Sequence, residues 1–131
     1  MGTDFNPDWG QSTEVTFEEI AGNNTMKYGN LNYQGTQLMD PVDLSGMEFL
    51  HIDMWTADAT VMLITPISQT TGERLFDMTP ITAGTWNSYD IPLSFFTEGG
   101  VTLTDIFQMK FDGQAGVTPS NIWLDNIYFK K

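Results

Sequence analysis

Two aromatic-rich segments near the C-terminus constrain the fold most. They span residues 104–111 and 121–129, and both are rich in aromatic and β-branched side chains. The residues between them, 112–120, supply the Asp, Gly, Pro and Ser that are common in turns. This pattern predicts two strands that pair as a hairpin and close a β-sandwich.

The rest of the chain has the same character. Six Pro and twelve Gly separate short segments, aromatic residues make up 13% of the chain, and long charged helical runs are missing. We therefore predict an all-β fold with two antiparallel sheets. The length of 131 residues fits a single domain over residues 1–131. The abrupt start and the Lys130-Lys131 end predict a module excised from a larger multidomain protein.

Charge and cysteine content exclude several function classes. The formal net charge is -12, so phosphate backbones would be repelled and nucleic acid is excluded as a partner. Neutral ligands and cations stay compatible with this charge. No Cys is present, which excludes disulfides and thiolate chemistry and fits a secreted bacterial domain. No apolar run reaches the roughly 18 residues of a membrane span, so no membrane insertion is predicted.

The clearest strand pattern covers residues 47–56. One face is predicted to be core and carries Leu50, Ile52 and Met54. The other face mixes rings with polar groups: Phe49, His51, Asp53 and Trp55. His51 either hydrogen-bonds a ligand or is a satisfied structural histidine, and Trp55 either caps the core or forms a stacking platform.

A cluster of rings and amides lies in residues 25–38, which we predict as one or two short strands broken by Gly29 and Gly35. A strand at 14–20 precedes them, with a turn at Asn23-Asn24. The cluster consists of Tyr28, Asn30, Asn32, Tyr33 and Gln34. Rings stack on sugar faces and amides bind sugar hydroxyls, so this is the chemistry of sugar recognition. The alternative is that the tyrosines pack inside the sandwich.

Further strands are predicted at 61–67, 74–79 and 83–93, followed by a loop or short helix at 94–100. Pro66 implies an edge or a bulge in the first of them. Trp86 and Ile91 are predicted core anchors.

The strand at 104–111 has a predicted polar face. Gln108 and Lys110 share this face with Ile106, and a long amide beside an amine suits hydroxyl ligands. The opposite face is predicted to carry Phe107, Met109 and Phe111.

Acidic and amide residues alternate in the N-terminal loop, at Asp4, Asn6 and Asp8. Oxygen-rich calcium loops have this spacing, although Val15 at the twelfth position excludes an EF-hand. The loop therefore predicts either part of a calcium site or an Asx-turn. Asp125 lies in an otherwise apolar strand, where a buried carboxylate needs a hydrogen-bond partner or a metal.

Catalytic chemistry is sparse. The chain has one His, no Cys, no nucleophile elbow and no glycine-rich phosphate loop after a strand. The adjacent Glu18 and Glu19 point to opposite faces of their strand. These features favour binding over turnover, and we predict that the protein is not an enzyme.

Five segments of the sequence resemble the β-sandwich modules appended to secreted polysaccharide-degrading enzymes of Bacteroidota, such as laminarinase-like enzymes of glycoside hydrolase family sixteen. They are DFNPDWGQST, MKYGNLNYQGTQL, LSGMEFLHIDMWT, GTWNSYDIPLS and IWLDNIYFKK. The GTW and LDNIYF parts are shared widely among galactose-binding-like jelly rolls. The chain departs from the pattern at its start, where a strand before Thr3 is expected.

The resemblance implies a monomeric jelly-roll carbohydrate-binding module, secreted or at the cell surface, that targets an attached catalytic domain to a polysaccharide. It also implies a structural calcium ion held by Asp4, Asn6 and Asp125. We expect a β-glucan ligand, laminarin-type or mixed-linkage. The expected ligand-binding residues are Tyr28, Asn32, Tyr33, His51, Trp55, Gln108 and Lys110. The alternative is a structural spacer or protein-docking domain without glycan affinity.

Overall fold

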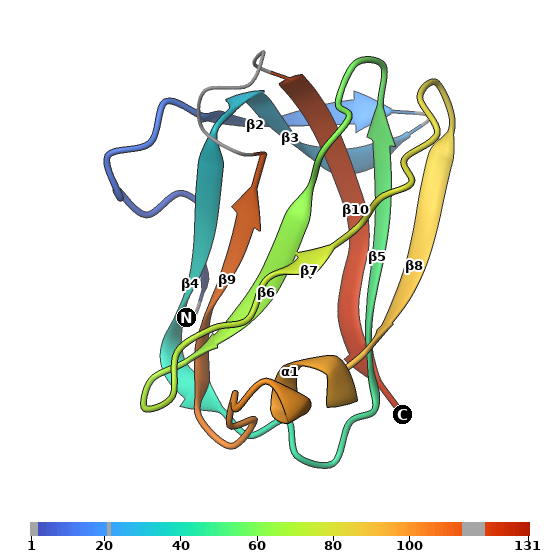
Figure 1. The fold of residues 1–131 in the computed structure, drawn as a ribbon. Helices are drawn as coiled ribbons and strands as arrows, with labels where there is room; N and C mark the ends of the chain where they lie inside the picture. Colours follow the sequence, from blue (N-terminus) through green and yellow to red (C-terminus); the bar gives the residue numbers. More distant parts are fainter. Residues whose placement is uncertain (1–2, 21, 114–119) are drawn as a thin grey trace.

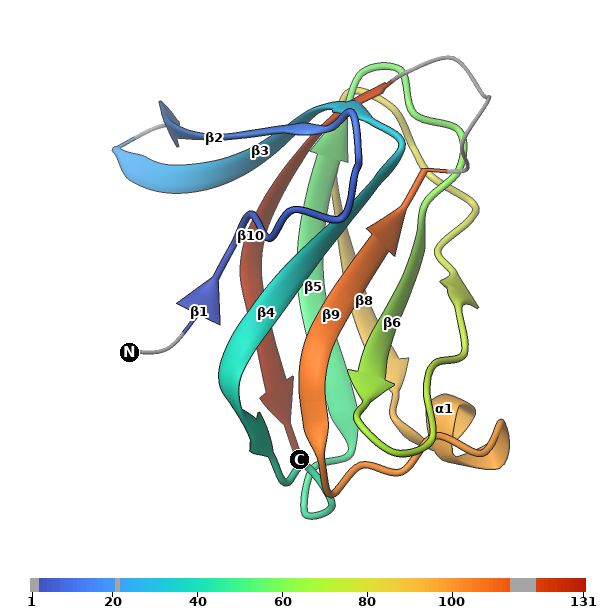
Figure 2. The ribbon, with the colours of Figure 1, turned by 90° about the vertical axis from the view of Figure 1, so that its left-hand side faces the viewer.

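Two five-stranded antiparallel sheets pack face to face in the computed structural model, which describes residues 3–20, 22–113 and 120–131 (Figures 1 and 2). Sheet A contains, in spatial order, β1 (Thr3–Asp4), β4 (Tyr33–Val42), β9 (Ile106–Asp112), β6 (Leu63–Ser68) and β7 (Phe76–Asp77). Sheet B contains β2 (Glu14–Ile20), β3 (Asn23–Leu31), β10 (Ser120–Lys130), β5 (Phe49–Thr56) and β8 (Trp86–Pro92). One short helix, α1 (Ser94–Glu98), follows β8. The predicted all-β sandwich is confirmed.

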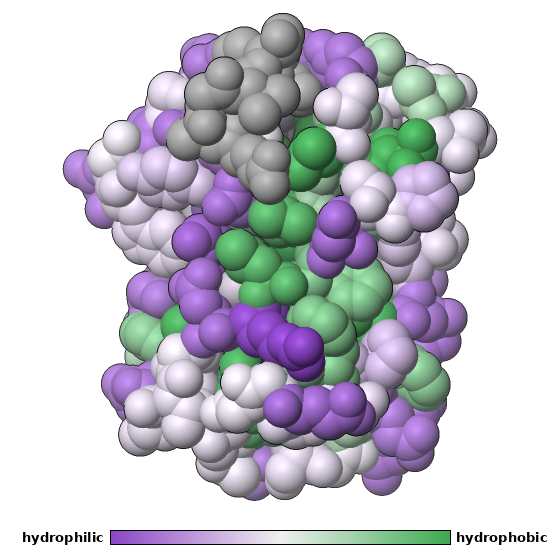
Figure 3. All heavy atoms as spheres, in the orientation of Figure 1, coloured by the Kyte–Doolittle hydropathy of each residue, from purple (hydrophilic) through white to green (hydrophobic). Residues whose placement is uncertain are grey.

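The core lies between the two sheets and follows the alternation of the strands. In β5, Leu50, Ile52 and Met54 are each 0% exposed, as predicted, while the residues between them are partly exposed. Apolar residues gather in a strip over β6 and β7, where the two sheets meet in this view, and hydrophilic residues flank it (Figure 3). The alternating pattern thus leaves each sheet with one core face and one outer face.

The predicted hairpin between the last two strands is wrong. β9 pairs with β4 and β6 in sheet A, whereas β10 pairs with β3 and β5 in sheet B. Both strands have an apolar face for the same core, and this pattern looks the same whether two strands pair edge to edge or face each other across the core. Most of the predicted turn, residues 114–119, lies outside the described residues.

β9 also has one residue on the unexpected side. Ile106 is fully buried rather than sharing the polar face of Gln108 and Lys110. The pairings of β9 with β4 and with β6 both shift register between Gln108 and Ile106. An irregularity of this kind moves the side chains beyond it to the other face of the sheet.

The β2–β3 hairpin projects beyond the rest of the sandwich (Figure 2). Asn23, predicted to form a turn with Asn24, instead begins β3 and pairs with Ile20. The predicted break at Gly29 does not occur, and the chain passes from β3 to β4 at Asn32. These long strands bring the end of the hairpin to the outer side of sheet B.

Pro66 lies in β6 where this strand has β9 on one side and, within the described part of the chain, no strand on the other, because β7 pairs only with Leu63 and Ile64. The predicted edge position is therefore confirmed. Among the residues that the structure describes, no helix has the length and apolar character needed to cross a membrane.

Candidate functional site

The outer face of sheet A carries polar side chains from β4 and β9. Gln37 of β4, Gln108 of β9 and Ile67 of β6 are aligned, and Gly35, Lys110 and Thr65 form the next row. Aligned residues point to the same side of a sheet, so Gln108 and Lys110 share this face. The Gln108 amide donates to Gln37 Oε1 at 2.5 Å, and Lys110 Nζ lies 3.3 Å from Glu73 Oε2.

An indole ring from the N-terminal loop lies on this face. The ring of Trp9 rests against Gly35, where a Cβ atom would overlap the six-membered part of the indole. Glycine in a strand interior often marks such a close approach. Tyr33 stands beside this ring, and its hydroxyl donates to the Trp9 carbonyl at 2.8 Å. The missing side chain of Gly35 therefore leaves the space that the Trp9 indole occupies.

The side-chain amides of Gln11 and Gln34 hold the loop that carries Trp9. Gln34 is 0% exposed and accepts from the Gln11 amide at 3.0 Å. Gln11 in turn accepts from the Trp9 backbone N–H at 2.8 Å and donates to the Pro7 carbonyl at 2.9 Å. Buried polar groups with partners fix geometry, because leaving one unpaired costs about 1–3 kcal/mol. The hydrogen bonds of Gln11 and Gln34 thus fix the position of the Trp9 ring.

These elements enclose an open groove of about 350 Å³, which we call the sheet A groove. It is lined by Trp9, Tyr33, Ile67, Glu73, Gln108, Lys110 and Asp112. Its size falls in the range of small-ligand sites, which combine apolar walls with a few polar groups. The structure therefore brings together three predicted ligand-binding residues: Tyr33, Gln108 and Lys110.

The outer face of sheet B carries three of the four tryptophans in one line. Trp123 of β10 is aligned with Trp55 of β5, and Trp55 with Trp86 of β8. The rings of Trp55 and Trp123 meet edge to face, with centroids 5.4 Å apart. Trp55 is therefore on the outer face, as predicted. Trp86, a predicted core anchor, is 43% exposed, and that prediction is wrong because its neighbours Asn87 and Tyr89 take the inward side of β8.

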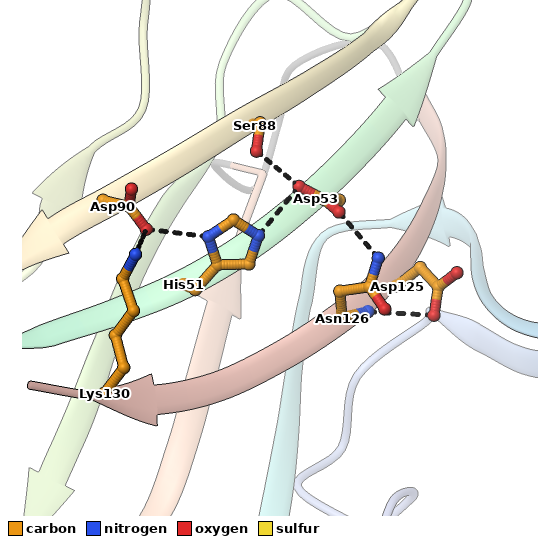
Figure 4. A network of polar contacts seen from close by, with 7 residues as sticks. All are labelled: His51, Asp53, Ser88, Asp90, Asp125, Asn126 and Lys130. Carbon is orange, nitrogen blue, oxygen red and sulfur yellow. Dashed lines mark hydrogen bonds and ion pairs between the residues drawn. The ribbon is translucent and has the colours of Figure 1, made fainter.

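His51 belongs to a polar network next to the tryptophans (Figure 4). Its Nδ1 lies 2.7 Å from Asp90 Oδ1 and its Nε2 lies 3.1 Å from Asp53 Oδ1. The ring also stacks on Tyr128, with centroids 4.8 Å apart. Both ring nitrogens are engaged, so His51 is a satisfied structural histidine and does not offer a nitrogen to a sugar hydroxyl.

The same network controls the charge of its carboxylates. Partial burial of Asp53 opposes ionisation, but hydrogen bonds from Ser88 and Asn126 and the charge of His51 outweigh it and lower the pKa of Asp53. Hydrogen bonds from His51 and Lys130 lower the pKa of Asp90. Both groups are therefore carboxylates at neutral pH.

Two predicted ligand-binding residues have structural roles. Tyr28 is 0% exposed, and its ring packs edge to face on Phe111 at 5.3 Å. Burial raises the pKa of the Tyr28 hydroxyl, and the ring cannot stack on a sugar. Asn32 uses its side-chain oxygen to accept from Ser12, Thr13 and Tyr33 within the described chain. The prediction that Tyr28 stacks on a sugar is wrong, whereas hydrogen bonding of the Asn32 amide to a sugar stays a prediction.

Two of the predicted calcium ligands, Asp4 and Asn6, are neighbours, but Asp125 belongs to the other sheet. Asp4 lies in β1 at the edge of sheet A, where its Oδ1 accepts from the Asn6 backbone at 2.9 Å, which is the Asx-turn alternative. Asp125 is half-buried in β10 of sheet B and accepts from Asn126 at 2.9 Å. Residues 3–20, 22–113 and 120–131 contain no group of three His, Cys, Asp or Glu placed to hold a metal. The residues do not fit a shared site, and calcium binding stays a prediction.

Sequence reasoning missed Trp9, Trp123 and the exposure of Trp86. Gly35 within a strand pattern was the available signal for a close approach, although nothing in the sequence shows which ring approaches. Trp123 could have been placed from the alternation of β10, since its neighbours Ile122 and Leu124 are both buried.

The family model named "Carbohydrate binding domain 30" matches residues 56–131, which is more than half of the chain. This chain belongs to that family of carbohydrate-binding modules. The matched part contributes Glu73, Gln108 and Lys110 to the sheet A groove. The module is non-catalytic, in agreement with the prediction from the sequence.

Solved structures of carbohydrate-binding modules share the fold. The family 11 module of the cellulosomal cellulase Lic26A-Cel5E of Clostridium thermocellum is 18% identical, with a TM-score of 0.71 over 99% of this chain and 88% of that chain. A family 30 module is 13% identical, with a TM-score of 0.70 over 90% of this chain and 76% of that chain. The Clostridium thermocellum family 11 module in complex with a β-1,3-1,4-mixed-linked tetrasaccharide is 18% identical, with a TM-score of 0.63 over 98% and 95%. A comparison with curated protein sequences found no match.

Proposed function

We propose that this module binds a neutral β-glucan chain, laminarin-type or mixed-linkage, in the sheet A groove. The observation that carries the proposal is the Trp9 ring held against Gly35, beside Tyr33, Gln108 and Lys110. Rings supply flat surfaces for the apolar faces of sugars, and amide and ammonium groups donate to their hydroxyls. The mixed-linked tetrasaccharide in the family 11 structure supports this ligand class.

The charges in the groove favour a neutral ligand. Lys110 is paired with Glu73, and Asp112 lines the same groove. With a net charge of -12, the module would repel a polyanionic glycan. Stacking on the two rings provides a modest gain, about 0.5–1.5 kcal/mol per ring, so the expected affinity is roughly micromolar to millimolar.

Weak binding of this kind is useful when the module is linked to a catalytic domain. A linked module raises the effective concentration of the enzyme at its substrate. We therefore propose that the module targets an attached polysaccharide-degrading enzyme, and that it works outside the cell, where such polymers occur.

Affinity electrophoresis with mixed-linkage glucan and laminarin tests this proposal. Trp9→Ala should weaken binding about two- to tenfold, by removing one stacking surface. Phe5→Ala is the matched control, because Phe5 is an exposed ring of the same loop whose contact is Phe17 rather than the groove. Equal mobility of Trp9→Ala and the unmodified module, with both folded, would remove the sheet A groove as the site. Absence of retardation by any glycan would favour the spacer function.

A further inference from the structure

The tryptophans of sheet B form a groove of their own. Trp55, Trp86 and Trp123 line it together with Glu18 and Ile20 of β2, and its volume is about 330 Å³. We call it the tryptophan groove. Ile20 and Trp86 belong to the two edge strands of sheet B, yet they line the same space. The β2–β3 hairpin must therefore curl over the outer face and form one wall, opposite the line of rings.

Polar groups continue the tryptophan groove along the strands. A second hollow of about 260 Å³ shares Ile20 and Trp86 with it. Its remaining lining is polar: Asn23, Thr25, Asp53, Asp125 and Asn126. An aromatic surface that runs into a row of amides and carboxylates is the combination found in small-ligand sites, where the polar groups fix orientation.

The carboxylates keep hydrogen-bonding capacity for a ligand. Among the described residues, Asp53 Oδ1 contacts His51 and Ser88, whereas Oδ2 accepts one bond, from the Asn126 amide at 2.8 Å. Each carboxylate oxygen accepts about two hydrogen bonds, so Oδ2 can take one more. The His51 and Ser88 contacts hold the group in place (Figure 4). Asp53 is thus an oriented acceptor for a hydroxyl.

Charge selects among ligands that present hydroxyls. The side chains of Asp53, Asp125 and Glu18 all line this region. Lys27 lies 4.9 Å from the centroid of the Trp123 ring and is paired with Glu18 at 3.6 Å. Uronic acids and sulfated sugars would meet carboxylates here without a free partner, so the groove suits a neutral sugar.

We infer that the tryptophan groove is a second binding site, for a neutral glycan chain, on the side of the sandwich opposite the sheet A groove. The inference goes beyond the proposed function, because it concerns a different sheet and a separate set of residues. A module with two outward-facing sites holds two chains, or two stretches of one chain, at once. Its binding to polymer then exceeds its binding to a short oligosaccharide by avidity.

The test uses affinity electrophoresis on mixed-linkage glucan, laminarin, xylan and mannan, with polygalacturonate as an anionic probe. The variants are Trp9→Ala, Trp55→Ala, Trp86→Ala and the double variant Trp9→Ala/Trp55→Ala, each checked for folding by circular dichroism. Phe17→Ala is the matched control, since Phe17 is an exposed ring of β2 that alternates with Glu18 and faces the other side. Trp86→Ala keeps the test valid if Trp55→Ala does not fold.

Trp9→Ala should still be retarded by a neutral glycan. The double variant Trp9→Ala/Trp55→Ala should bind that glycan about two- to tenfold more weakly than Trp9→Ala. Polygalacturonate should not retard any variant. If the tryptophan variants match Phe17→Ala on every glycan, the inference is overturned. It is also overturned if sedimentation velocity shows a dimer that Trp86→Ala dissociates, because the groove then binds a second copy. If the sheet A groove is not a binding site, the result differs: Trp9→Ala then binds as well as the unmodified module, whereas Trp55→Ala and Trp86→Ala lose all binding.

Discussion

The two outer faces of this sandwich present aromatic rings in different ways. On sheet B, Trp123, Trp55 and Trp86 come from adjacent strands and are aligned by the register of the sheet itself. On sheet A, the main ring belongs to Trp9, which reaches the face from a loop and rests on Gly35. Strand-borne rings are fixed by the backbone hydrogen bonds of the sheet, whereas the loop-borne ring depends on the Gln34 and Gln11 amides.

A flat aromatic surface for a ligand can therefore be formed either by the strands of a sheet or by a loop that lies on the sheet. The backbone position of a ring on a strand changes only with the register, and a one-residue shift would turn every side chain of that strand to the other face. A ring on a loop can be moved by one substitution beneath it. The sheet A groove should therefore be the more easily altered of the two faces.

The largest effect is expected where an aromatic ring lies in the core rather than on a face. Tyr28→Ala should lower the free energy of unfolding by about 3–5 kcal/mol, because the buried ring leaves a cavity. Trp86→Ala, at a 43% exposed position, should lower it by clearly less, about 1–2 kcal/mol, because only part of this ring is buried. Urea unfolding measures both values. A loss of several kcal/mol in Trp86→Ala would mean that this ring supports the fold rather than a face.

A smaller effect is expected from a change under the loop-borne ring. Gly35→Ala places a methyl group where the Trp9 indole lies, so the ring must move. Binding in the sheet A groove should fall about as far as in Trp9→Ala, two- to tenfold, with a stability cost of about 1–3 kcal/mol. Gly46→Ala is the matched control, because no atom lies within 4 Å of its added Cβ. Unchanged affinity in Gly35→Ala, measured by titration calorimetry, would contradict the role of Trp9.

Acid should weaken the polar network of sheet B. The pKa of Asp53 is lowered in the folded state, so its contribution to stability is present above its unfolded pKa of about 3.9 and is lost as pH falls through the folded pKa. Asp53→Asn should therefore show a smaller drop in melting temperature than the unmodified module between pH 5 and about pH 2. The same pH dependence in both proteins would mean that Asp53 carries no depressed pKa.

The smallest effect is expected from chelation. Calcium binding by Asp4, Asn6 and Asp125 stays a prediction, although Asp4 and Asp125 lie in different sheets. A bound ion that prefers the folded state raises the melting temperature, and EDTA would then lower it. An unchanged melting temperature after extended dialysis against EDTA would remove calcium from the account.

The strands and the core of this module could be predicted from the sequence, because alternation is a local property. Leu50, Ile52 and Met54 were placed correctly in this way. Sheet membership was not predictable, since β9 and β10 carry the same kind of pattern and yet lie in opposite sheets. The polar face of Gln108 and Lys110 was found, but its ring partner was not, because Trp9 is distant along the chain from both.

The predicted ligand residues also divide between the two faces. Tyr33, Gln108 and Lys110 line the sheet A groove, whereas Trp55 lines the tryptophan groove. Ring-and-amide composition marks sugar chemistry but does not tell which side of a strand, or which sheet, a residue occupies. Tyr28 and Tyr33 are the same residue type, yet Tyr28 is buried in the core on β3 of sheet B, whereas Tyr33 lines the outer groove on β4 of sheet A.

A titration followed through the four tryptophan indole N–H signals tests the two-site account most directly. In a ¹⁵N-labelled module, the mixed-linked tetrasaccharide should shift the Trp9 signal along one saturation curve and the Trp55, Trp86 and Trp123 signals along another. The second curve should persist in Trp9→Ala. Signals of sheet B that stay in place, or that lose their shifts when Trp9 is removed, would contradict two independent sites.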